Sequence, residues 1–209
     1  MLILKINPVR NRKFLNGVNQ RNFKEIVKIV VQSIKQGKVI VCPTDTIYGL
    51  IANVANKKAV ERIFKIKKRS KKKPYPIFIK DLKQAKKIAR IDKKQEKFLK
   101  RVWPGEITAV LKRKKIKTNL YGVDKKTIAF RIPKYKFIIE LIKKTGCPLI
   151  ETSVNISNQP PITKIEDILN HFKKRKHQPD LIVNAGNLPK IKPSTVLDLT
   201  VSPPKILRK

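Results

Sequence analysis

Apolar residues recur along most of this chain with the spacing of either a helix or a strand. Residues 22–36 repeat apolar side chains every three or four positions, which predicts an amphipathic helix with a capping box at Asn22 and Glu25 and an end at Gly37. The next run, VIVC at 39–42, is apolar throughout, as expected of a strand buried on both faces. A helix is therefore expected to lead directly into a buried strand.

The same interleaving continues to the end of the chain. Helix boundaries are predicted at the caps Asn56, Asp81 and Asp92, at the stop Gly146, and at a capping box of Thr163 and Glu166. Strands are predicted at the opening MLILKINPVR and at 77–79, 107–111, 127–132, 149–150, 181–183, 195–199 and 205–208. Because strands and helices alternate with uneven connections, we expect a single α/β domain over residues 1–209, with a mixed sheet and flanking helices.

The charge balance indicates the kind of partner. Lys and Arg number 51 and Asp and Glu number 14, which gives a net charge of +37. The usual magnitude for a small domain is about 2–8. Such a field attracts polyanions, phosphates above all, and predicts retention on nucleic acid at low salt. The charge does not by itself specify a function.

Other features of the sequence bear on the compartment. No apolar run approaches the ~20 residues that a membrane helix needs, and MLILKINPVR lacks the apolar core and cleavage site of a signal peptide. Cys42 and Cys147 lie far apart and are interpreted as small buried thiols in a reducing compartment. We therefore expect a cytoplasmic protein with no membrane segment and no metal site built by the chain.

Polar residues interrupt the pattern at four places, and function is expected where local rules fail. The first place, PTDTIYGL at 43–50, follows a buried strand, where open α/β sheets bind ligands, although an ordinary polar turn fits equally well. The second is Lys67, which continues the apolar stripe of the helix after Asn56 and is followed by Arg69. From the pattern alone, snorkelling of Lys67 to solvent is favoured over entry into a cleft.

The other two interruptions lie in the second half of the chain. In TIAFRI, alternation puts Thr127 and Arg131 on the face opposite the large apolar side chains, and an arginine on a solvent-facing surface is slightly favoured there. The segment ETSVNISNQPP at 151–161 offers a ligand the hydroxyl of Ser153 and the amide of Asn155, although a helix-capping turn fits about equally well. Glycine cradles of the G-x-x-x-x-G-K-[ST] and G-x-G-x-x-G types are absent from the sequence, as is a G-x-S-x-G elbow.

Taken in order, these segments resemble the threonylcarbamoyl-adenylate synthase family, whose domain is called YrdC-like. The matching stretches, spread over residues 22–208, are VIVCPTDTIYGL, KIKKRSKKKP, WPGEIT, TIAFRIP, TSVNISNQPP, PSTVLDL and the terminal ILR. The resemblance implies a twisted α/β sheet with a large basic concave face. It implies a nucleotidyltransferase that joins L-threonine, bicarbonate or CO2 and ATP into threonylcarbamoyl-AMP, with release of pyrophosphate, for t6A37 modification of tRNA.

The resemblance also implies site residues. The K-x-R…S-x-N signature of the family falls on Lys67, Arg69, Ser153 and Asn155, the expected catalytic centre, and this overrides snorkelling for Lys67. ATP contacts are implied at Arg69, Lys73, Thr127, Ser153, Pro161 and Arg208, and threonine contacts at Thr46, Arg131, Glu151 and Ser194. Three positions depart from the family pattern: Lys73 replaces an asparagine, Phe78 replaces a histidine, and Glu151 replaces a small residue, so that contact at Glu151 is expected through its backbone.

Partners follow from the same resemblance. Mg²⁺ is expected to accompany ATP, and a separate threonylcarbamoyl transferase complex is expected to consume the product. A non-catalytic RNA-binding protein that uses the basic face is the alternative from another class, and the two activities are compatible. A nearer rival is a relative that adenylates another carbamoyl substrate, as in hydrogenase maturation, although such domains usually belong to longer chains.

Overall fold

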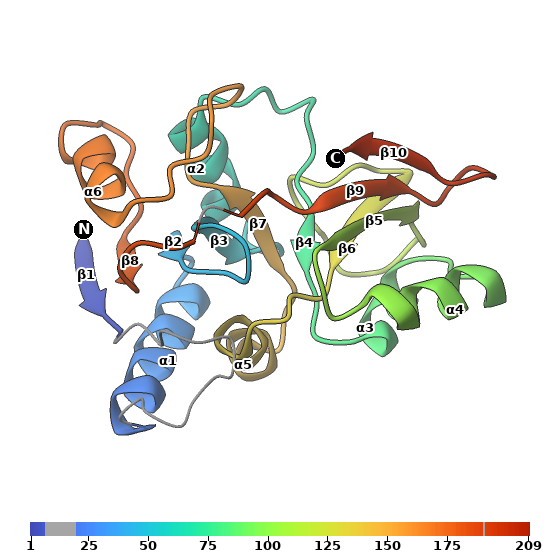
Figure 1. The fold of residues 1–209 in the computed structure, drawn as a ribbon, viewed down its shortest axis with the longest axis horizontal. Coiled ribbons are helices and arrows are strands. Elements are labelled where there is room, and N and C mark those ends of the chain that lie inside the picture. The colour runs from blue at the N-terminus through green and yellow to red at the C-terminus, as the bar shows by residue number, and fades with distance from the viewer. Residues whose placement is uncertain (7–19, 190) are drawn as a thin grey trace.

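The computed structural model describes residues 1–6, 20–189 and 191–209 (Figure 1). Within these ranges the chain forms ten strands and six helices. The strands are β1 (Leu2–Lys5), β2 (Ile40–Cys42), β3 (Gly49–Asn53), β4 (Ile77–Phe78), β5 (Ile107–Lys112), β6 (Thr127–Arg131), β7 (Leu149–Ser153), β8 (Leu181–Asn184), β9 (Thr195–Asp198) and β10 (Lys205–Arg208). The helices are α1 (Gln20–Lys35), α2 (Lys57–Lys67), α3 (Leu82–Ile88), α4 (Lys93–Val102), α5 (Lys136–Thr145) and α6 (Ile165–Lys173).

All ten strands belong to one sheet, in the order β1-β8-β2-β3-β7-β4-β6-β5-β9-β10. Four neighbouring pairs are parallel (β1/β8, β2/β8, β4/β6 and β5/β9) and the other five are antiparallel. The predicted mixed α/β sheet is therefore confirmed. Figure 1 shows β7 near the middle of the molecule, so the strands that carry the polar interruptions lie close to its centre.

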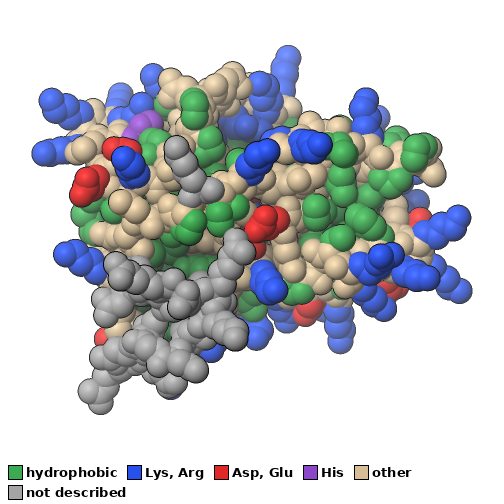
Figure 2. Space-filling model, viewed as in Figure 1, with side chains coloured by type: hydrophobic (Ala, Val, Ile, Leu, Met, Phe, Trp, Pro, Cys, Tyr) green, Lys and Arg blue, Asp and Glu red, His purple; other side chains and the backbone are tan. Residues whose placement is uncertain are grey.

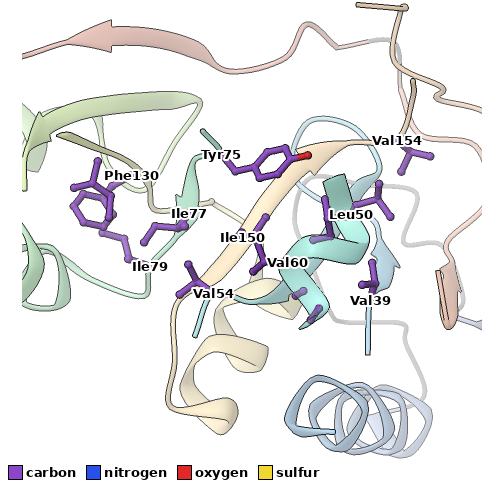
Figure 3. Packing of buried hydrophobic residues seen from close by; sticks show 14 of the residues in the cluster. Val39, Leu50, Val54, Val60, Tyr75, Ile77, Ile79, Phe130, Ile150 and Val154 are labelled. Carbon is purple, nitrogen blue, oxygen red and sulfur yellow. The ribbon is translucent and has the colours of Figure 1, made fainter. Parts of the chain in front are cut away.

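Alternation along the buried strands divides the core between the two faces of the sheet. In the predicted strand VIVC, Val39 and Val41 belong to one apolar cluster, and Ile40 and Cys42 belong to the other. The first cluster packs α2, α3, α4 and α6 against the sheet, and Figure 3 shows part of it. The second packs α1 and α5, which lie side by side in Figure 1. Burial on both faces explains why this strand has no polar alternation.

Three of the predicted helix starts are confirmed in atomic detail. Asn56, Asp81 and Asp92 each accept a hydrogen bond from the backbone N–H three residues later, and Asp92 forms a full capping box with Gln95. The predicted end at Gly146 is also confirmed, because this residue caps α5 in the left-handed region at φ 75°. Local polar chemistry therefore sets these boundaries.

Two predicted capping boxes are wrong. Helix α1 begins at Gln20, so Asn22 lies inside its first turn rather than at its cap. Helix α6 has Lys164 as its N-cap, with no side-chain cap hydrogen bond, so Thr163 lies one residue too early. Strand β3, which pairs with β2 and β7, was not predicted, because its short apolar core begins with glycine and ends with asparagine.

The hydroxyl of Tyr48 joins the start of β3 to the segment after β8. Tyr48 is fully buried, its Oη donates to the carbonyl of Gly186 (2.7 Å), and it accepts from the N–H of Ala185 (2.9 Å). Burial raises the pKa of this phenol to about 12. The contact fixes the loop between β2 and β3, which contains the first polar interruption.

On the molecular surface, Lys and Arg side chains are spread around the visible outline in Figure 2. None of the described helices combines the length and the apolar character needed to cross a lipid bilayer. Many separate Lys and Arg side chains on the side shown therefore contribute to the attraction of polyanions that the net charge predicts.

Candidate active site

Two cationic side chains, buried Lys67 and half-buried Arg69, lie at the end of α2. Lys67 is the last residue of the helix, and Lys68 caps it in the left-handed region at φ 47°, which a non-glycine residue adopts only at a cost. This sharp stop turns the chain immediately after Lys67, so that Arg69 leaves in a new direction. Lys67 is 2% exposed. Snorkelling, which the apolar stripe alone favoured, is therefore wrong.

The ammonium group of Lys67 is held by the segment after β7. Its Nζ donates to the carbonyl oxygen of Ser153 (2.6 Å), to the carbonyl oxygen of Asn155 (3.2 Å) and to Asn155 Oδ1 (2.6 Å). Ser157 N–H also donates to the backbone carbonyl of Lys67 (2.8 Å). Residues more than 80 positions apart in sequence thus meet, as the signature requires.

Asn155 organises this contact. Its Oδ1 also accepts from the hydroxyl of Ser153 (2.7 Å), and its Nδ2 donates to the carbonyl of Gln159. The partners fix the orientation of the amide, since an ammonium must face the oxygen and a carbonyl must face the NH2 group. Both ends of the Asn155 side chain are therefore occupied inside the protein, and its direct effect is to orient Lys67 and Ser153.

Lys67 has no carboxylate within ion-pair distance among the described residues. Burial and the nearby charge of Arg69 lower its pKa to about 8, while the more distant charge of Glu151 acts in the opposite direction. At neutral pH most molecules keep the charge, and it is compensated only by neutral oxygens. Its three N–H donors are bonded within the protein, but its positive charge is not cancelled and can attract an anion that binds nearby.

Arg69 lies half-buried beside Lys67. Its Nε and Nη2 donate to the carbonyls of Lys73 (3.0 Å) and Pro74 (3.1 Å), and its guanidinium stacks 4.9 Å from the centroid of the Tyr75 ring. Lys73 Nζ in turn reaches the side-chain oxygen of Asn158 (3.5 Å). The loop after α2 therefore contacts the turn after β7 through Lys73 and Asn158.

Arg131, at the end of β6, is buried in the same central part of the sheet. It is 1% exposed, so the solvent-facing position favoured by the pattern is wrong. Its Nε donates to the carbonyl of Gly105 (3.0 Å), and its Nη1 donates to Thr46 Oγ1 (3.4 Å). Its Nη2 lies 2.8 Å from Asp45 Oδ1, in an ion pair that is not aligned as a hydrogen bond. The other oxygen of Asp45 accepts from Lys134 N–H (2.8 Å).

Ser194 and Arg208 form a third group. Arg208 Nη2 donates to the carbonyl of Ser194 (2.8 Å) and to its hydroxyl (3.2 Å). The Ser194 hydroxyl also lies 2.8 Å from the hydroxyl of Thr108 on β5. The last strand therefore points its arginine back toward the strands that carry the other site residues.

Glu151 connects the three groups. It lies on β7, and the charges of Arg131, Arg208 and Lys67 each act to lower its pKa. Burial nevertheless raises the pKa of this carboxyl group above its usual value. Its backbone N–H donates to the carbonyl of Pro76 (3.1 Å), so the backbone N–H is already used.

Among the described residues, the side chains of Thr127, Pro161 and Phe78 make no hydrogen bond to the other expected site residues. Thr127 is four residues before Arg131 on β6, a separation of about 13 Å along a strand, and its hydroxyl donates to Asp124 (3.2 Å). Pro161 is half-buried after the Asn155 turn. Phe78 is fully buried, with its ring centroid 5.8 Å from the Arg131 guanidinium.

Sequence reasoning missed some of the supporting residues. Asp45 stands inside the noted segment PTDTIYGL but was given no role, and its partner is 86 residues away. Thr108 and Gln159 were not singled out either. No group of three or more His, Cys, Asp or Glu side chains that could hold a metal ion occurs in the part of the chain that the structure describes.

Comparisons with known proteins identify the family of this chain. A family model described as telomere recombination (Sua5, YciO and YrdC) matches residues 32–209. A Pyrococcus abyssi protein named threonylcarbamoyl-AMP synthase is 33% identical over 193 residues, covering 92% of this chain and 56% of that protein. The present chain thus spans little more than half the length of this relative.

Solved structures give the same result. Sua5 of P. abyssi complexed with L-threonine superposes with a TM-score of 0.82 and 30% identity, covering 100% of this chain and 57% of that one. YciO of Escherichia coli superposes with a TM-score of 0.82 and 28% identity, covering 100% of this chain and 96% of that one. A family match over most of the sequence, together with this structural likeness, shows that the chain belongs to the Sua5/YciO/YrdC family.

Proposed function

We propose that this protein is an L-threonylcarbamoyladenylate synthase, which makes threonylcarbamoyl-AMP and pyrophosphate from L-threonine, bicarbonate or CO2, and ATP. The observation that carries the proposal is the buried Lys67 ammonium, compensated only by neutral oxygens of Ser153 and Asn155. Names of relatives support it, since the matched P. abyssi protein is named as such a synthase. The single domain over 1–209 is part of the same proposal.

In the reaction, the threonine amine loses a proton and attacks CO2 to give N-carboxy-threonine. The new carboxylate then attacks the α-phosphorus of ATP, and pyrophosphate leaves. No protein nucleophile is needed, because transfer of this type depends on positioning and on neutralisation of charge. Lys67, Arg69 and Arg208 would face the phosphates, with Lys73, Thr127 and Pro161 around the nucleotide.

The amino-acid end of the substrate is assigned to the neighbouring group. Arg131 and Thr46 would bind the threonine carboxylate, and Ser194 would contribute its hydroxyl. Asp45 already balances one charge of Arg131. This end of the site therefore suits a zwitterion, whereas the uncompensated Lys67 suits a polyphosphate.

Mg²⁺ would reach this site on the phosphates of ATP. Mg²⁺ is usually bound by one or two carboxylates together with substrate phosphates and water, and the described residues contain no group of three or more His, Cys, Asp or Glu that could hold a metal ion without the substrate. Asp45 is moreover occupied by Arg131 and by Lys134 N–H. The chain therefore does not fit a metal ion of its own, and neutralisation by the protein is assigned to the three cations named above.

We further propose that the product passes to a threonylcarbamoyl transferase complex that modifies t6A37 in tRNA, in the cytoplasm. Two free thiols, Cys42 and Cys147, fit a reducing compartment. A second candidate, a non-catalytic RNA-binding protein with a large basic concave face, is favoured by the net charge of +37.

Mass spectrometry tests the catalytic proposal directly. Purified protein with ATP, L-threonine and isotopically labelled bicarbonate should yield labelled threonylcarbamoyl-AMP and pyrophosphate, and omission of bicarbonate should abolish both. Replacing threonine and bicarbonate by carbamoyl phosphate should give no adenylate. If tRNA is bound with a steep salt dependence but no adenylate forms, the RNA-binding candidate replaces the synthase.

A further inference from the structure

A groove of about 730 Å³ runs between α1 and α5, the two helices that cover the face of the sheet opposite to α2. The residues of α1 that line it repeat at intervals of three and four positions from Phe23 to Lys35, and those of α5 repeat every four positions from Lys136 to Lys144. Each set therefore follows one face of its helix. From Lys24 to Lys35, helix α1 rises about 16 Å, which gives the groove the length of about three helical turns.

The floor of this groove is apolar and its rim is cationic. Val27 and Val31 form the floor together with the half-buried ring of Phe23, which contacts Phe137 of α5 edge to face (centroids 5.9 Å apart). The rim carries five exposed lysines: Lys24, Lys28, Lys35, Lys136 and Lys144. The aliphatic stems of such side chains add apolar surface, while their ammonium groups stay in water. An apolar strip is thus bordered by positive charge.

The positive charge of the rim is not balanced within the described part of the chain. Glu140 is the one carboxylate among the described residues that line the groove, and its Oε1 lies 3.5 Å from the Nζ of Lys143, which is not part of the lining. None of the five rim lysines has an ion-pair partner among the residues that the structure describes. An acidic occupant with an apolar surface would complement both the rim and the floor.

Shape and chemistry together favour a helix as the occupant. A helix lays an apolar face into a groove of this kind, with residues at i, i+3, i+4 and i+7 as its contacts. RNA would bring phosphates to the lysines but would leave the apolar floor uncovered. A second copy of this chain would bring another rim of lysines and a net charge of +37, both of which oppose association.

We propose that the groove between α1 and α5 binds an acidic amphipathic helix of a partner protein. Apolar side chains of that helix contact Phe23, Val27 and Val31, and its Asp and Glu side chains face the rim lysines. The inference goes beyond the proposed function and does not depend on it, because no residue of the groove belongs to the candidate active site.

Fluorescence anisotropy of the full chain with a labelled synthetic peptide tests the proposal. The probe is a peptide of about 14 residues with Leu at i, i+3, i+4 and i+7 and with Glu and Ala on its other faces, long enough for the groove when helical. At about 0.15 M salt, where charges are screened beyond about 8 Å, wild type should bind the probe. Lys24→Glu combined with Lys28→Glu should lower its affinity about tenfold or more, because two attractive contacts become repulsive.

Two controls separate this contact from the general attraction of a basic protein. Lys93→Glu combined with Lys97→Glu changes two exposed residues of α4 with the same spacing and the same change in net charge, and should bind the probe as wild type does. A second peptide with Ser in place of Leu should bind wild type at least about tenfold more weakly, because it buries less apolar surface.

Equal affinity of wild type for the two peptides, an equal loss in the two double variants, or absence of probe binding by wild type would overturn the inference. So would a dimer, or binding to an RNA oligonucleotide or to phosphatidylserine vesicles, that is lost with Lys24→Glu and Lys28→Glu, since the groove would then take one of those occupants. Adenylate synthesis is measured separately and should be the same in this variant and in wild type. Its absence from wild type would reject the proposed function and leave the inference on the groove intact.

Discussion

Two buried cations, Lys67 at the end of α2 and Arg131 on β6, are compensated in different ways. Lys67 is surrounded by carbonyl and amide oxygens, none of which carries a charge. Arg131 is paired with the carboxylate of Asp45 and bonded to neutral oxygens of Gly105 and Thr46. The donors of Lys67 are all bonded, whereas Nη2 of Arg131 is in an ion pair without an aligned hydrogen bond. Only the first arrangement leaves a net positive charge for a ligand.

The difference teaches how two neighbouring groups of residues in a highly basic protein can distinguish two kinds of ligand. A site with an unbalanced ammonium attracts a polyanion. A site whose guanidinium is already balanced holds a molecule that is neutral overall, by geometry more than by charge. Exchange of the compensating groups between the two cations therefore tests the comparison directly.

The largest expected effect follows removal of the charged partner of Arg131. Asp45→Asn would leave the buried guanidinium without its carboxylate, which should lower the free energy of unfolding by about 3–5 kcal/mol. Denaturant titration followed by circular dichroism measures it. Asp167→Asn, at an exposed position of α6, is the matched control and should change stability little. Equal stability of the two variants would show that the ion pair is not needed.

Removal of the unbalanced charge should act on catalysis. Lys67→Ala should lower threonine- and bicarbonate-dependent pyrophosphate release by ~10²–10³, as found for the loss of a donor to developing charge. Lys65→Ala, exposed on the same helix, serves as the control and should retain activity. Near-full activity of a folded Lys67→Ala variant would remove Lys67 from the phosphate site. Arg69→Ala should act in the same direction.

A third variant gives Lys67 a carboxylate partner, as Arg131 has in Asp45. Asn155→Asp would still accept from Lys67 and from the Ser153 hydroxyl, and would balance the ammonium with a carboxylate, although it would lose the bond that Nδ2 donates to the Gln159 carbonyl. We expect the KM for ATP to rise about tenfold, because one positive charge is cancelled close to the phosphates. Asn170→Asp on α6 introduces the same charge at an exposed position. If both variants raise KM equally, the effect is one of net charge and not of this contact.

The smallest effect is a pH dependence. With a pKa of about 8, Lys67 loses its proton as pH rises, so kcat/KM for ATP should fall about fourfold between pH 7 and 8.5 from this group alone. Arginine stays charged throughout this range. Lys67→Arg should therefore show a lower but flat profile, and a fall of the same size in that variant would assign the titration to another group.

Local chemistry made part of this structure predictable. Caps at Asn56, Asp81 and Asp92 were evident because an acceptor side chain bonds a backbone N–H only three residues away. The start of α6 was misplaced because its cap at Lys164 has no such side-chain bond. The pattern could not predict β3, since its strand character comes from pairing with β2 and β7 rather than from its own composition.

The site was predictable only where a family signature marked it. Apolar periodicity alone favoured a solvent-exposed Lys67, and strand alternation alone favoured a solvent-exposed Arg131. Both predictions were wrong, because neither pattern reveals what covers a face of the sheet. Asp45 and Arg131 meet across 86 residues of sequence, a distance over which no local rule operates. The likeness of the KIKKR and TSVN segments to a family predicted the contact between Lys67 and Asn155, which spacing alone could not predict.

The two hydrogen bonds that the Tyr48 hydroxyl makes with Ala185 and Gly186 allow local opening of the structure to be measured. The amide proton of Ala185 is bonded to a phenol oxygen in the buried interior, so it can exchange with deuterium only when the loop before β3 separates from the segment after β8. Its protection factor therefore reports how often the molecule opens beside Asp45 and Thr46. Binding of an amino acid to those residues should slow this exchange without any change in the average fold.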